Sequence, residues 1–285
     1  MKDIGQVIMK TLKSSPIPLD VFYDTDSICL YHGDCLAVMQ TLPDSFVDMI
    51  FADPPYHLSN DGITCQAGKM VKVNKGKWDK SNGFEQDVEF HERWISECRR
   101  ILKPSGTIWI SGTNHNIFQC GYLLQKLGFH ILNDITWYKP NAAPNLACKT
   151  FAHSHETLIW AVKDKRSKYI FNYDAMKSTN DQSDKFKNAG KQMRTVWGIN
   201  SAPKSEKIFG KHPTQKPLTL LIRVITASTN AGSVILDPFN GGGTTGAAAS
   251  IIGQRKYIGI DIDKEFLELT ISRIEQAQSQ RKLIG

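Results

Sequence analysis

The stretch Val234–Ala249, VILDPFNGGGTTGAAA, decides the fold class of this chain. An apolar run typical of a buried strand ends at Asp237, three consecutive glycines (241–243) form a loop, and a helix-forming segment begins at Thr244. Glycines let the backbone pass close to a ligand, and a helix N-terminus presents free N–H groups. The order of strand, glycine loop and helix therefore predicts a nucleoside-binding turn in an α/β protein.

A second strand, YIGID (Tyr257–Asp261), follows this turn and ends in an acid. A carboxylate at this place suits the hydroxyls of a ribose. The loop is not a P-loop because GxxxxGK[ST] is absent, and Asp237 would repel a pyrophosphate but attract an ammonium group. S-adenosylmethionine carries a ribose, an amino-acid ammonium and a sulfonium, so it is the cofactor that the pattern predicts.

Strands and helices alternate along most of the chain. Apolar, β-branched runs typical of strands are Ser27–Tyr31, Val47–Ala52, Thr107–Ser111, Asn133–Tyr138, Glu156–Val162, Val234–Leu236 and Tyr257–Ile260. Segments with helical periodicity are Glu89–Leu102, Ile117–Leu127, Lys216–Thr229, Thr244–Ile252 and Lys264–Gln278. Such alternation predicts a mainly parallel sheet with helices on both faces, in which ligands bind beyond the carboxyl ends of the strands.

Two segments do not fit the alternation. His57–Lys80 is rich in Gly, Asn and Lys and too long for a tight strand–helix connection, so we predict a mobile functional loop. Asp164–Lys211 is basic and polar with interleaved aromatic residues, which indicates an insertion or a small subdomain.

Positive charge is concentrated in the middle of the chain. Between Tyr138 and Lys211 there are 14 Lys and Arg residues against 6 Asp and Glu, which accounts for the whole net charge of +7. Such a surface favours polyanions, because neutralisation of phosphates drives non-specific affinity for nucleic acid. A solvated basic face is the alternative that charge alone leaves open.

The composition is that of an ordinary soluble globular protein, with 41% hydrophobic and 22% charged residues. No apolar run approaches the roughly 18 residues of a membrane span, and the N-terminus lacks the features of a signal peptide. Six cysteines are scattered without a CxxC pair, which favours reduced thiols over a disulfide framework or a zinc site. We therefore expect a cytoplasmic protein with no metal and no membrane partner.

A second motif, Asp53-Pro54-Pro55-Tyr56, ends the apolar run Val47–Ala52. A stiff turn would need only one proline, whereas methyl transfer to an exocyclic amine needs acceptors for its N–H groups on a rigid backbone. The Asp53 carboxylate and the Pro54 carbonyl would be those acceptors, and Tyr56 would stack on an extruded base. Beside the cofactor motif, the tetrapeptide is a candidate catalytic site.

The two motifs, DPPY (53–56) and DPFNGGGTT (237–245), together resemble those of the amino-group DNA methyltransferases. These enzymes modify adenine N6 or cytosine N4 with S-adenosylmethionine. The catalytic motif precedes the basic segment and the cofactor motif comes last, which is the permuted order of the β group. Further segments that look like the β group are Trp78-Asp79-Lys80, Leu102–Gly112, Ile135–Leu146 and Lys211–Pro217. The likeness is greatest to the adenine methyltransferases of GATC-type restriction systems, including the type that tolerates single-stranded DNA.

The resemblance implies roles for individual residues. The catalytic tetrapeptide corresponds to Asp53, Pro54, Pro55 and Tyr56. The residues that match the cofactor site are Asp34, Lys216, Asp237, Phe239, Gly241, Gly243, Thr244 and Asp261.

Two of these matches have specific places beside the cofactor, and one neighbouring residue departs from the family. Asp34 matches the strand-end acid near the cofactor adenine, and Lys216 belongs to the segment that lies beside the methionine carboxylate. Gly242 departs from the family, which usually has Ser there. Because glycine still permits the turn, we expect activity to survive.

The fold that the resemblance implies is a Rossmann-like, doubly wound, mostly parallel sheet of seven strands in permuted order, with the last strand antiparallel. Residues 1–163 would form the catalytic half of the methyltransferase domain and 212–285 its cofactor-binding half. Residues 164–211 would form a small basic target-recognition insertion. The implied partners are DNA and, within a restriction–modification system, a cognate restriction endonuclease; β-group relatives also often form homodimers.

The implied activity is site-specific methylation of adenine N6 after the base has flipped out of the helix. Cytosine N4 is the nearest alternative, but Asp rather than Ser at the head of the tetrapeptide favours adenine. An RNA or protein-amide methyltransferase is a second alternative, and Asp rather than Asn at position 53 weighs against a protein glutamine as acceptor. A non-catalytic DNA-binding subunit would be expected to have lost one of the two motifs, and both are intact.

Two other features are weaker. His153 and His155 have no matching carboxylate or Cys partner in the sequence, so a metal site is disfavoured and contact with DNA is the alternative. Trp78, in the predicted loop, is a further candidate for contact with DNA.

Overall fold

The computed structural model describes residues 20–56, 63–66, 69–72, 79–179 and 184–284. Within them, nine strands form one sheet in the order β1-β2-β11-β10-β3-β6-β8-β7-β9. Their bounds are β1 Asp20–Asp24, β2 Ile28–His32, β3 Val47–Ala52, β6 Leu102–Gly112, β7 His130–Tyr138, β8 His155–Val162, β9 Val196–Gly198, β10 Val234–Asp237 and β11 Lys256–Asp261. A separate hairpin pairs β4 (Ile63–Gln66) with β5 (Lys69–Lys72).

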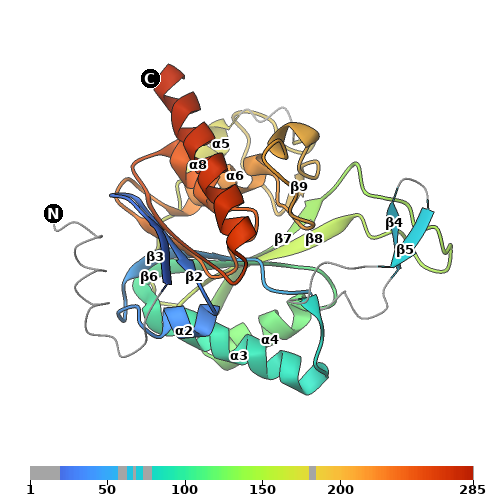
Figure 1. Cartoon of the computed structure of the whole chain (residues 1–285), viewed down its shortest axis with the longest axis horizontal. Coiled ribbons are helices and arrows are strands. Elements are labelled where there is room, and N and C mark those ends of the chain that lie inside the picture. Colours follow the sequence, from blue (N-terminus) through green and yellow to red (C-terminus); the bar gives the residue numbers. More distant parts are fainter. Residues whose placement is uncertain (1–19, 57–62, 67–68, 73–78, 180–183, 285) are drawn as a thin grey trace.

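Helices cover both faces of the sheet (Figure 1). One face is covered by α2 (Cys35–Met39), α3 (Phe84–Ile101) and α4 (Ile117–Lys126), whose buried apolar side chains share one core with the sheet. The other face is covered by α6 (Leu218–Ser228), α7 (Thr244–Ile252) and α8 (Lys264–Ile284), which belong to a second core. The central strands read as continuous apolar runs because they are buried from both sides.

The expected seven-stranded core is confirmed as β2-β11-β10-β3-β6-β8-β7. The antiparallel member is β8, which lies between β6 and β7 and opposes both. It is therefore not the last strand along the chain, because the two strands of the cofactor-binding half follow it. The edge strands β1 and β9 are additions that the sequence did not predict, since one is largely exposed and begins and ends with Asp, and the other is only three residues long.

The pairing of β10 with β3 joins the two ends of the sequence. Ile235 lies opposite Met49 and Leu236 opposite Ile50, in parallel register. Asp237, the last residue of β10, and Asp53, directly after β3, therefore leave the sheet at the same edge. Parallel strands that meet across such a crossover are where α/β proteins bind ligands.

Residues of the basic segment are anchored on the body of the protein. Its strand β9 extends the sheet beside β7, and α5 (Tyr173–Ser178) packs near α6. The buried carboxylate of Asp184 lies 2.5 Å from the guanidinium of Arg223 in α6 and accepts the Gly198 N–H at 2.9 Å. The rings of Tyr169 and Phe171 pack on Trp160 of β8. Several of its aromatic side chains are therefore used in packing.

Most of the predicted loop His57–Lys80 lies outside the described residues, including Trp78. The described part comprises the hairpin β4–β5 and the last two residues, Asp79 and Lys80.

Candidate active site

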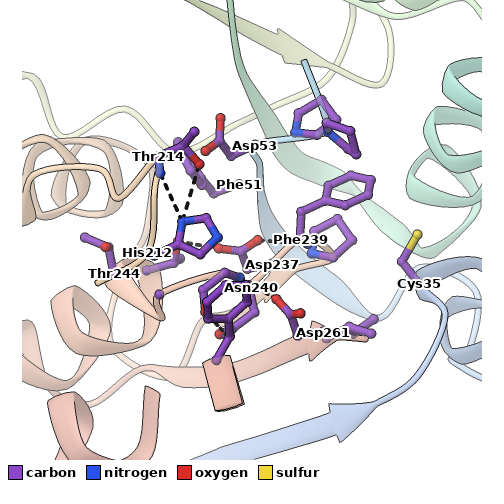
Figure 2. A pocket seen from close by; sticks show the side chains of 18 of the residues that line it. Cys35, Phe51, Asp53, His212, Thr214, Asp237, Phe239, Asn240, Thr244 and Asp261 are labelled. Atoms are coloured by element: carbon purple, nitrogen blue, oxygen red, sulfur yellow. Dashed lines mark hydrogen bonds between the residues drawn. The ribbon is translucent and has the colours of Figure 1, made fainter. Parts of the chain in front are cut away.

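A cavity of about 240 Å³ lies beyond the carboxyl ends of β3, β10 and β11 (Figure 2). The predicted site residues that line it are Asp34, Asp53, Pro54, Pro55, Tyr56, Lys216, Asp237, Phe239, Gly241, Thr244 and Asp261. The remaining one, Gly243, lies in the turn that supports the cavity wall. Residues separated by more than two hundred positions along the chain, such as Asp34 and Asp261, are thus brought to one site.

The carboxylate of Asp237 is held by the turn that it begins. One oxygen accepts the Phe239 N–H at 3.1 Å and the other accepts the Thr245 hydroxyl at 2.6 Å. Burial raises the pKa of Asp237 to about 7, although both hydrogen bonds oppose this rise. A cationic ligand beside the carboxylate would restore its charge, because an opposite charge favours the ionised form.

Asp261 fixes the glycine loop from the neighbouring strand. Its carboxylate accepts the Gly241 N–H at 2.7 Å and the Asp263 N–H at 3.0 Å. Burial raises the pKa of Asp261 to about 6, against the effect of these two bonds. A carboxylate has about four lone-pair sites, so Asp261 retains acceptor capacity toward the cavity.

The third wall of the cavity combines an acid with an aromatic ring. Asp34 caps α2 by accepting the Ala37 N–H at 3.0 Å. The ring of Phe239 is fixed edge-on against Trp94 and Phe90, with centroid distances of 5.3 and 6.2 Å. In Figure 2, Phe239 and Cys35 are on the same side of the cavity. An apolar ring beside an exposed acid suits a flat heterocycle that carries an amino group.

The backbone of the tetrapeptide is held in place by two side chains from other segments. The Tyr56 N–H donates to the buried carboxylate of Asp79 at 2.9 Å. The Asn116 side-chain amide donates to the Pro55 carbonyl at 3.2 Å. The rigidity of the motif therefore comes from tertiary hydrogen bonds as well as from its prolines.

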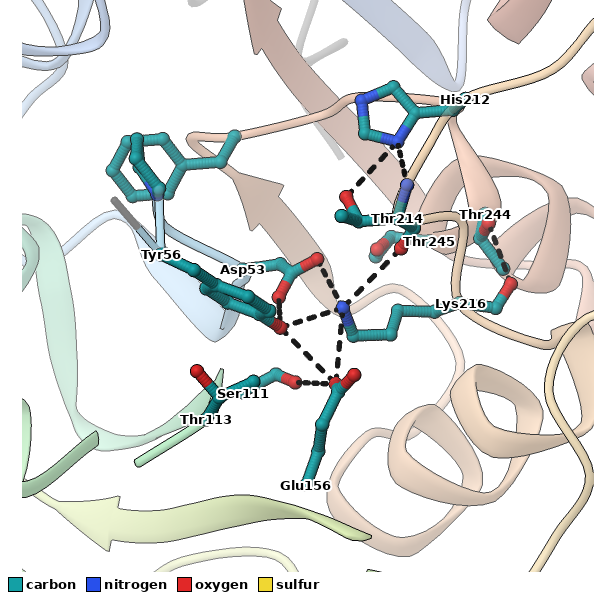
Figure 3. A network of polar contacts seen from close by, with 12 residues as sticks. Asp53, Tyr56, Ser111, Thr113, Glu156, His212, Thr214, Lys216, Thr244 and Thr245 are labelled. Atoms are coloured by element: carbon teal, nitrogen blue, oxygen red, sulfur yellow. Dashed lines mark hydrogen bonds and ion pairs between the residues drawn. The ribbon is translucent and has the colours of Figure 1, made fainter. Parts of the chain in front are cut away.

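Asp53 belongs to a network of buried polar side chains (Figure 3). Its carboxylate lies 2.5 Å from the Lys216 ammonium and accepts the Tyr56 hydroxyl at 2.5 Å. Burial raises the pKa of Asp53, and the neighbouring ammonium only partly opposes this. Burial lowers the pKa of Lys216, but the carboxylates of Asp53 and Glu156 outweigh it and raise that pKa overall. Lys216 therefore remains charged and stabilises the carboxylate form of Asp53.

The sequence matches a known protein family over most of its length. Residues 47–272 match the family of N6 and N4 enzymes described as DNA methylase. This chain belongs to that family. The match covers both motifs and the basic segment between them, so the expected family is confirmed for most of the chain.

Curated relatives of this methylase carry the same activity in their names. The chain is 49% identical over 255 residues to the type II methyltransferase M2.DpnII of Streptococcus pneumoniae, which covers 89% of this chain and 92% of that protein. It is 48% identical to the type II methyltransferase M2.LlaDCHI of Lactococcus lactis subsp. cremoris, over 90% of this chain and 92% of that protein. The expected S-adenosylmethionine-dependent DNA methyltransferase is thereby confirmed.

Two solved structures share this fold. The crystal structure of the M1.HpyAVI–SAM complex superposes on this methylase with a TM-score of 0.62 at 27% identity, and covers 87% of this chain and 98% of that one. The cytosine-N4-specific PvuII DNA methyltransferase shares the fold, with a TM-score of 0.67 at 17% identity over 92% of this chain and 94% of that one.

Some residues of the methylase site were missed from the sequence. Glu156 was identified only as the first residue of a strand, and its neighbours in the sequence carry no signal that the acid is buried. Asp79 lay in a segment noted for its family likeness, without a role. Lys216 was placed near the methionine carboxylate, whereas its ammonium here contacts Asp53 and Tyr56. His153 and His155 are exposed, and the described residues contain no cluster of three metal-binding side chains.

Gly243 supplies a test of the cofactor loop. Its φ is +67°, and a Cβ there would lie 2.3 Å from the Thr270 hydroxyl. We expect Gly243→Ala to lower the free energy of unfolding by about 2–4 kcal/mol, because strain and a steric clash add. Chemical denaturation measures this. The control is Gly232→Ala, at φ +84° with nothing within 4 Å, which should cost about 1 kcal/mol. Equal losses for the two variants would contradict the expected clash.

Proposed function

We propose that this methylase is a site-specific DNA adenine-N6 methyltransferase that acts on a base flipped out of the helix. The observation that carries the proposal is the pairing of β10 with β3, which places Asp237 and Asp53 on one cavity. A carboxylate suited to the cofactor and a carboxylate suited to the target amine thus face the same space.

The cofactor end of the cavity would be formed by the residues after β10, β11 and β2. Asp237 would accept the ammonium of S-adenosylmethionine, Asp261 its ribose hydroxyls, and Asp34 and Phe239 its adenine. When bound, the cofactor supplies an electrophilic methyl group on a sulfonium. Thr244, which donates to the Lys216 carbonyl at 3.2 Å, joins the glycine loop to the catalytic end.

The catalytic end would be formed by the tetrapeptide. The extruded adenine would stack on Tyr56, and its N6 hydrogens would bond to Asp53 and to the Pro54 carbonyl. Because these groups are fixed before the base arrives, they orient the nitrogen lone pair toward the methyl group at little reorganisation cost. The nitrogen would attack the methyl group directly, without a covalent enzyme intermediate, as the methyl–sulfur bond breaks, and the surplus proton on the methylated N6 would then be released to solvent. Asp rather than Ser at the first position of the tetrapeptide supports adenine over cytosine as the target base.

DNA would lie across the basic segment 164–211 and the neighbouring β7–β8 loop. Since several aromatic rings of the segment are packed on the sheet, its lysines would contact phosphates. The β7–β8 loop carries Phe151, whose side chain is 98% exposed, near the exposed Lys149 and His153. An exposed aromatic side chain flanked by positive charge suits nucleic acid.

The wider biological setting is also a proposal. The resemblance supports a restriction–modification system with a cognate endonuclease, GATC as the first recognition sequence to test, and a homodimer as the assembly to test. It supports a cytoplasmic location as well. Among the described residues, no helix is long and apolar enough to cross a bilayer.

The experiment that tests the target base is transfer of a tritiated methyl group from labelled cofactor to DNA, followed by nucleoside analysis. Oligonucleotides with and without GATC, each in single- and double-stranded form, separate sequence preference from strand preference. We expect the label in N6-methyldeoxyadenosine. Label in N4-methyldeoxycytidine would favour the alternative activity, and no label in any substrate would favour a non-catalytic DNA-binding subunit.

A further inference from the structure

Four charged side chains are gathered at the catalytic tetrapeptide, and two of them have no role in the chemistry above. The two acids are Asp53 and Glu156, and the two bases are Lys139 and Lys216. Their side chains are between 5% and 19% exposed. The cluster is formally neutral, with two negative and two positive charges in a largely buried environment.

Glu156, at the start of β8, connects the other members. One of its oxygens accepts the Tyr56 hydroxyl at 3.2 Å and lies 3.4 Å from the Lys216 ammonium (Figure 3). Its other oxygen pairs with Lys139. Ser111 of β6 lies 3.5 Å away and completes the contacts of the carboxylate. The tetrapeptide, the loop after β7, strand β6 and the segment before α6 therefore each contribute one polar partner to Glu156.

Asp53 and Glu156 have the same two polar partners, Lys216 and Tyr56. Lys216 is shared between the carboxylates of Asp53 and Glu156, so neither holds it alone. The Tyr56 hydroxyl is likewise within hydrogen-bond distance of both acids. Glu156 does not line the cavity, so it acts through these two neighbours rather than on a ligand.

Charge balance explains why Lys139 is part of the arrangement. Burial alone would raise the pKa of Glu156, but Lys216 and Lys139 together lower it. Glu156 is therefore ionised and neutralises the second lysine. Removing one partner of a buried pair leaves an uncompensated charge, which costs much more than removing both.

We propose that Glu156, neutralised by Lys139, is a positioning residue for methyl transfer: it is the second partner of the Tyr56 hydroxyl and the Lys216 ammonium, toward which both groups can shift when Asp53 accepts the target amine. This inference rests on the proposed function, because it assigns Asp53 and Tyr56 to the target base. It adds two residues from β8 and the β7–β8 loop to the catalytic machinery.

The test is a charge-compensation cycle on the full chain. Glu156→Gln keeps the shape but leaves an excess positive charge, and Lys139→Gln leaves an excess negative charge. We expect each single variant to lower kcat by about 10- to 100-fold, because each leaves a buried charge unpaired. The double variant restores neutrality, and we expect its kcat to recover to within about fivefold of wild type. Affinity for S-adenosylmethionine should not change in any of them.

The pH profile distinguishes positioning from a structural role. After burial and the Lys216 charge, the next influence on the pKa of Asp53 is the negative charge of Glu156, which raises it. Glu156→Gln removes that charge, so the acid limb of kcat that reports Asp53 should move to lower pH. A variant that is only less well folded would lose amplitude without this movement.

The matched control is the surface pair Glu92–Lys126. Its charged atoms lie 2.7 Å apart, and the side chains of Lys126 and Glu92 are 46% and 35% exposed. Glu92→Gln/Lys126→Gln should leave kcat within about twofold of wild type. The positioning role is overturned if Glu156→Gln retains wild-type kcat, or if the double variant is as slow as the product of the single losses. Rates are taken relative to wild type on whichever base accepts the label, so failure here is distinct from failure of the adenine assignment.

Discussion

Asp53→Ala is expected to lower methyl transfer by at least about a thousandfold while affinity for S-adenosylmethionine stays within about threefold. Asp53 is the only carboxylate of the tetrapeptide, and it lines the cavity. Its loss removes the acceptor that orients the amine. It also leaves Glu156 as the single remaining carboxylate partner of the buried Lys216 ammonium among the described residues. Single-turnover methylation and equilibrium titration of the cofactor measure the two effects separately.

Asp53→Asn is the informative companion variant. The amide keeps one oxygen acceptor and the shape of the side chain but lacks the charge, so its rate should lie between those of wild type and Asp53→Ala. The control is Asp44→Ala, which removes an exposed acid paired with Arg100 on the surface and should leave the rate unchanged. Near wild-type methylation by Asp53→Ala would exclude the proposed mechanism.

Asp237→Asn is expected to weaken binding of S-adenosylmethionine by about a hundredfold, with a smaller effect on DNA binding. The neutral amide cannot pair with the cofactor ammonium. Because burial raises the pKa of Asp237 to about 7, the carboxylate of the ligand-free protein gains a proton as pH falls through that value. Wild-type affinity should therefore weaken below about pH 7, whereas the affinity of the Asn variant should lack this dependence.

The stability of the protein should show the opposite trend at Asp237. Between its ordinary pKa of 3.8 and the raised value of about 7, the folded protein holds a proton that the unfolded chain has released. The free energy of unfolding therefore falls as pH rises through this window. Asp237→Asn should flatten that fall and be more stable than wild type at pH 8, as thermal unfolding would show. Asp174→Asn, an exposed acid in the first turn of α5, is the control. Unchanged cofactor affinity in the Asp237 variant would contradict its assignment to the ammonium.

The local elements follow from short-range patterns. The helix Thr244–Ile252 and the strand Val47–Ala52 have the predicted bounds, because a glycine turn and a proline pair mark their ends. The start of α3 was placed too late. Its first turn is polar, and Asp87 there accepts the Ser81 hydroxyl at 2.6 Å, a contact that helical periodicity does not report.

The candidate site was predictable only in part. Residues in sequence motifs, such as Asp53 and Asp237, were found because their neighbours constrain the backbone in a recognisable way. Glu156 was not found, since its partners Tyr56 and Lys216 lie 100 and 60 positions away. Nothing in its own neighbourhood indicates a buried acid with two lysines.

The sequence by itself determined the fold class, the cofactor and the two ends of the site. Each depends on contiguous residues, where steric limits on glycine and proline and the burial pattern of a strand act locally. Only the tertiary structure decided that Lys216 contacts Asp53 and that Glu156 and Lys139 complete a neutral cluster. The physical reason is that buried charges must find partners wherever the fold brings them, and the pairing of β10 with β3 is a long-range choice made by the whole sheet.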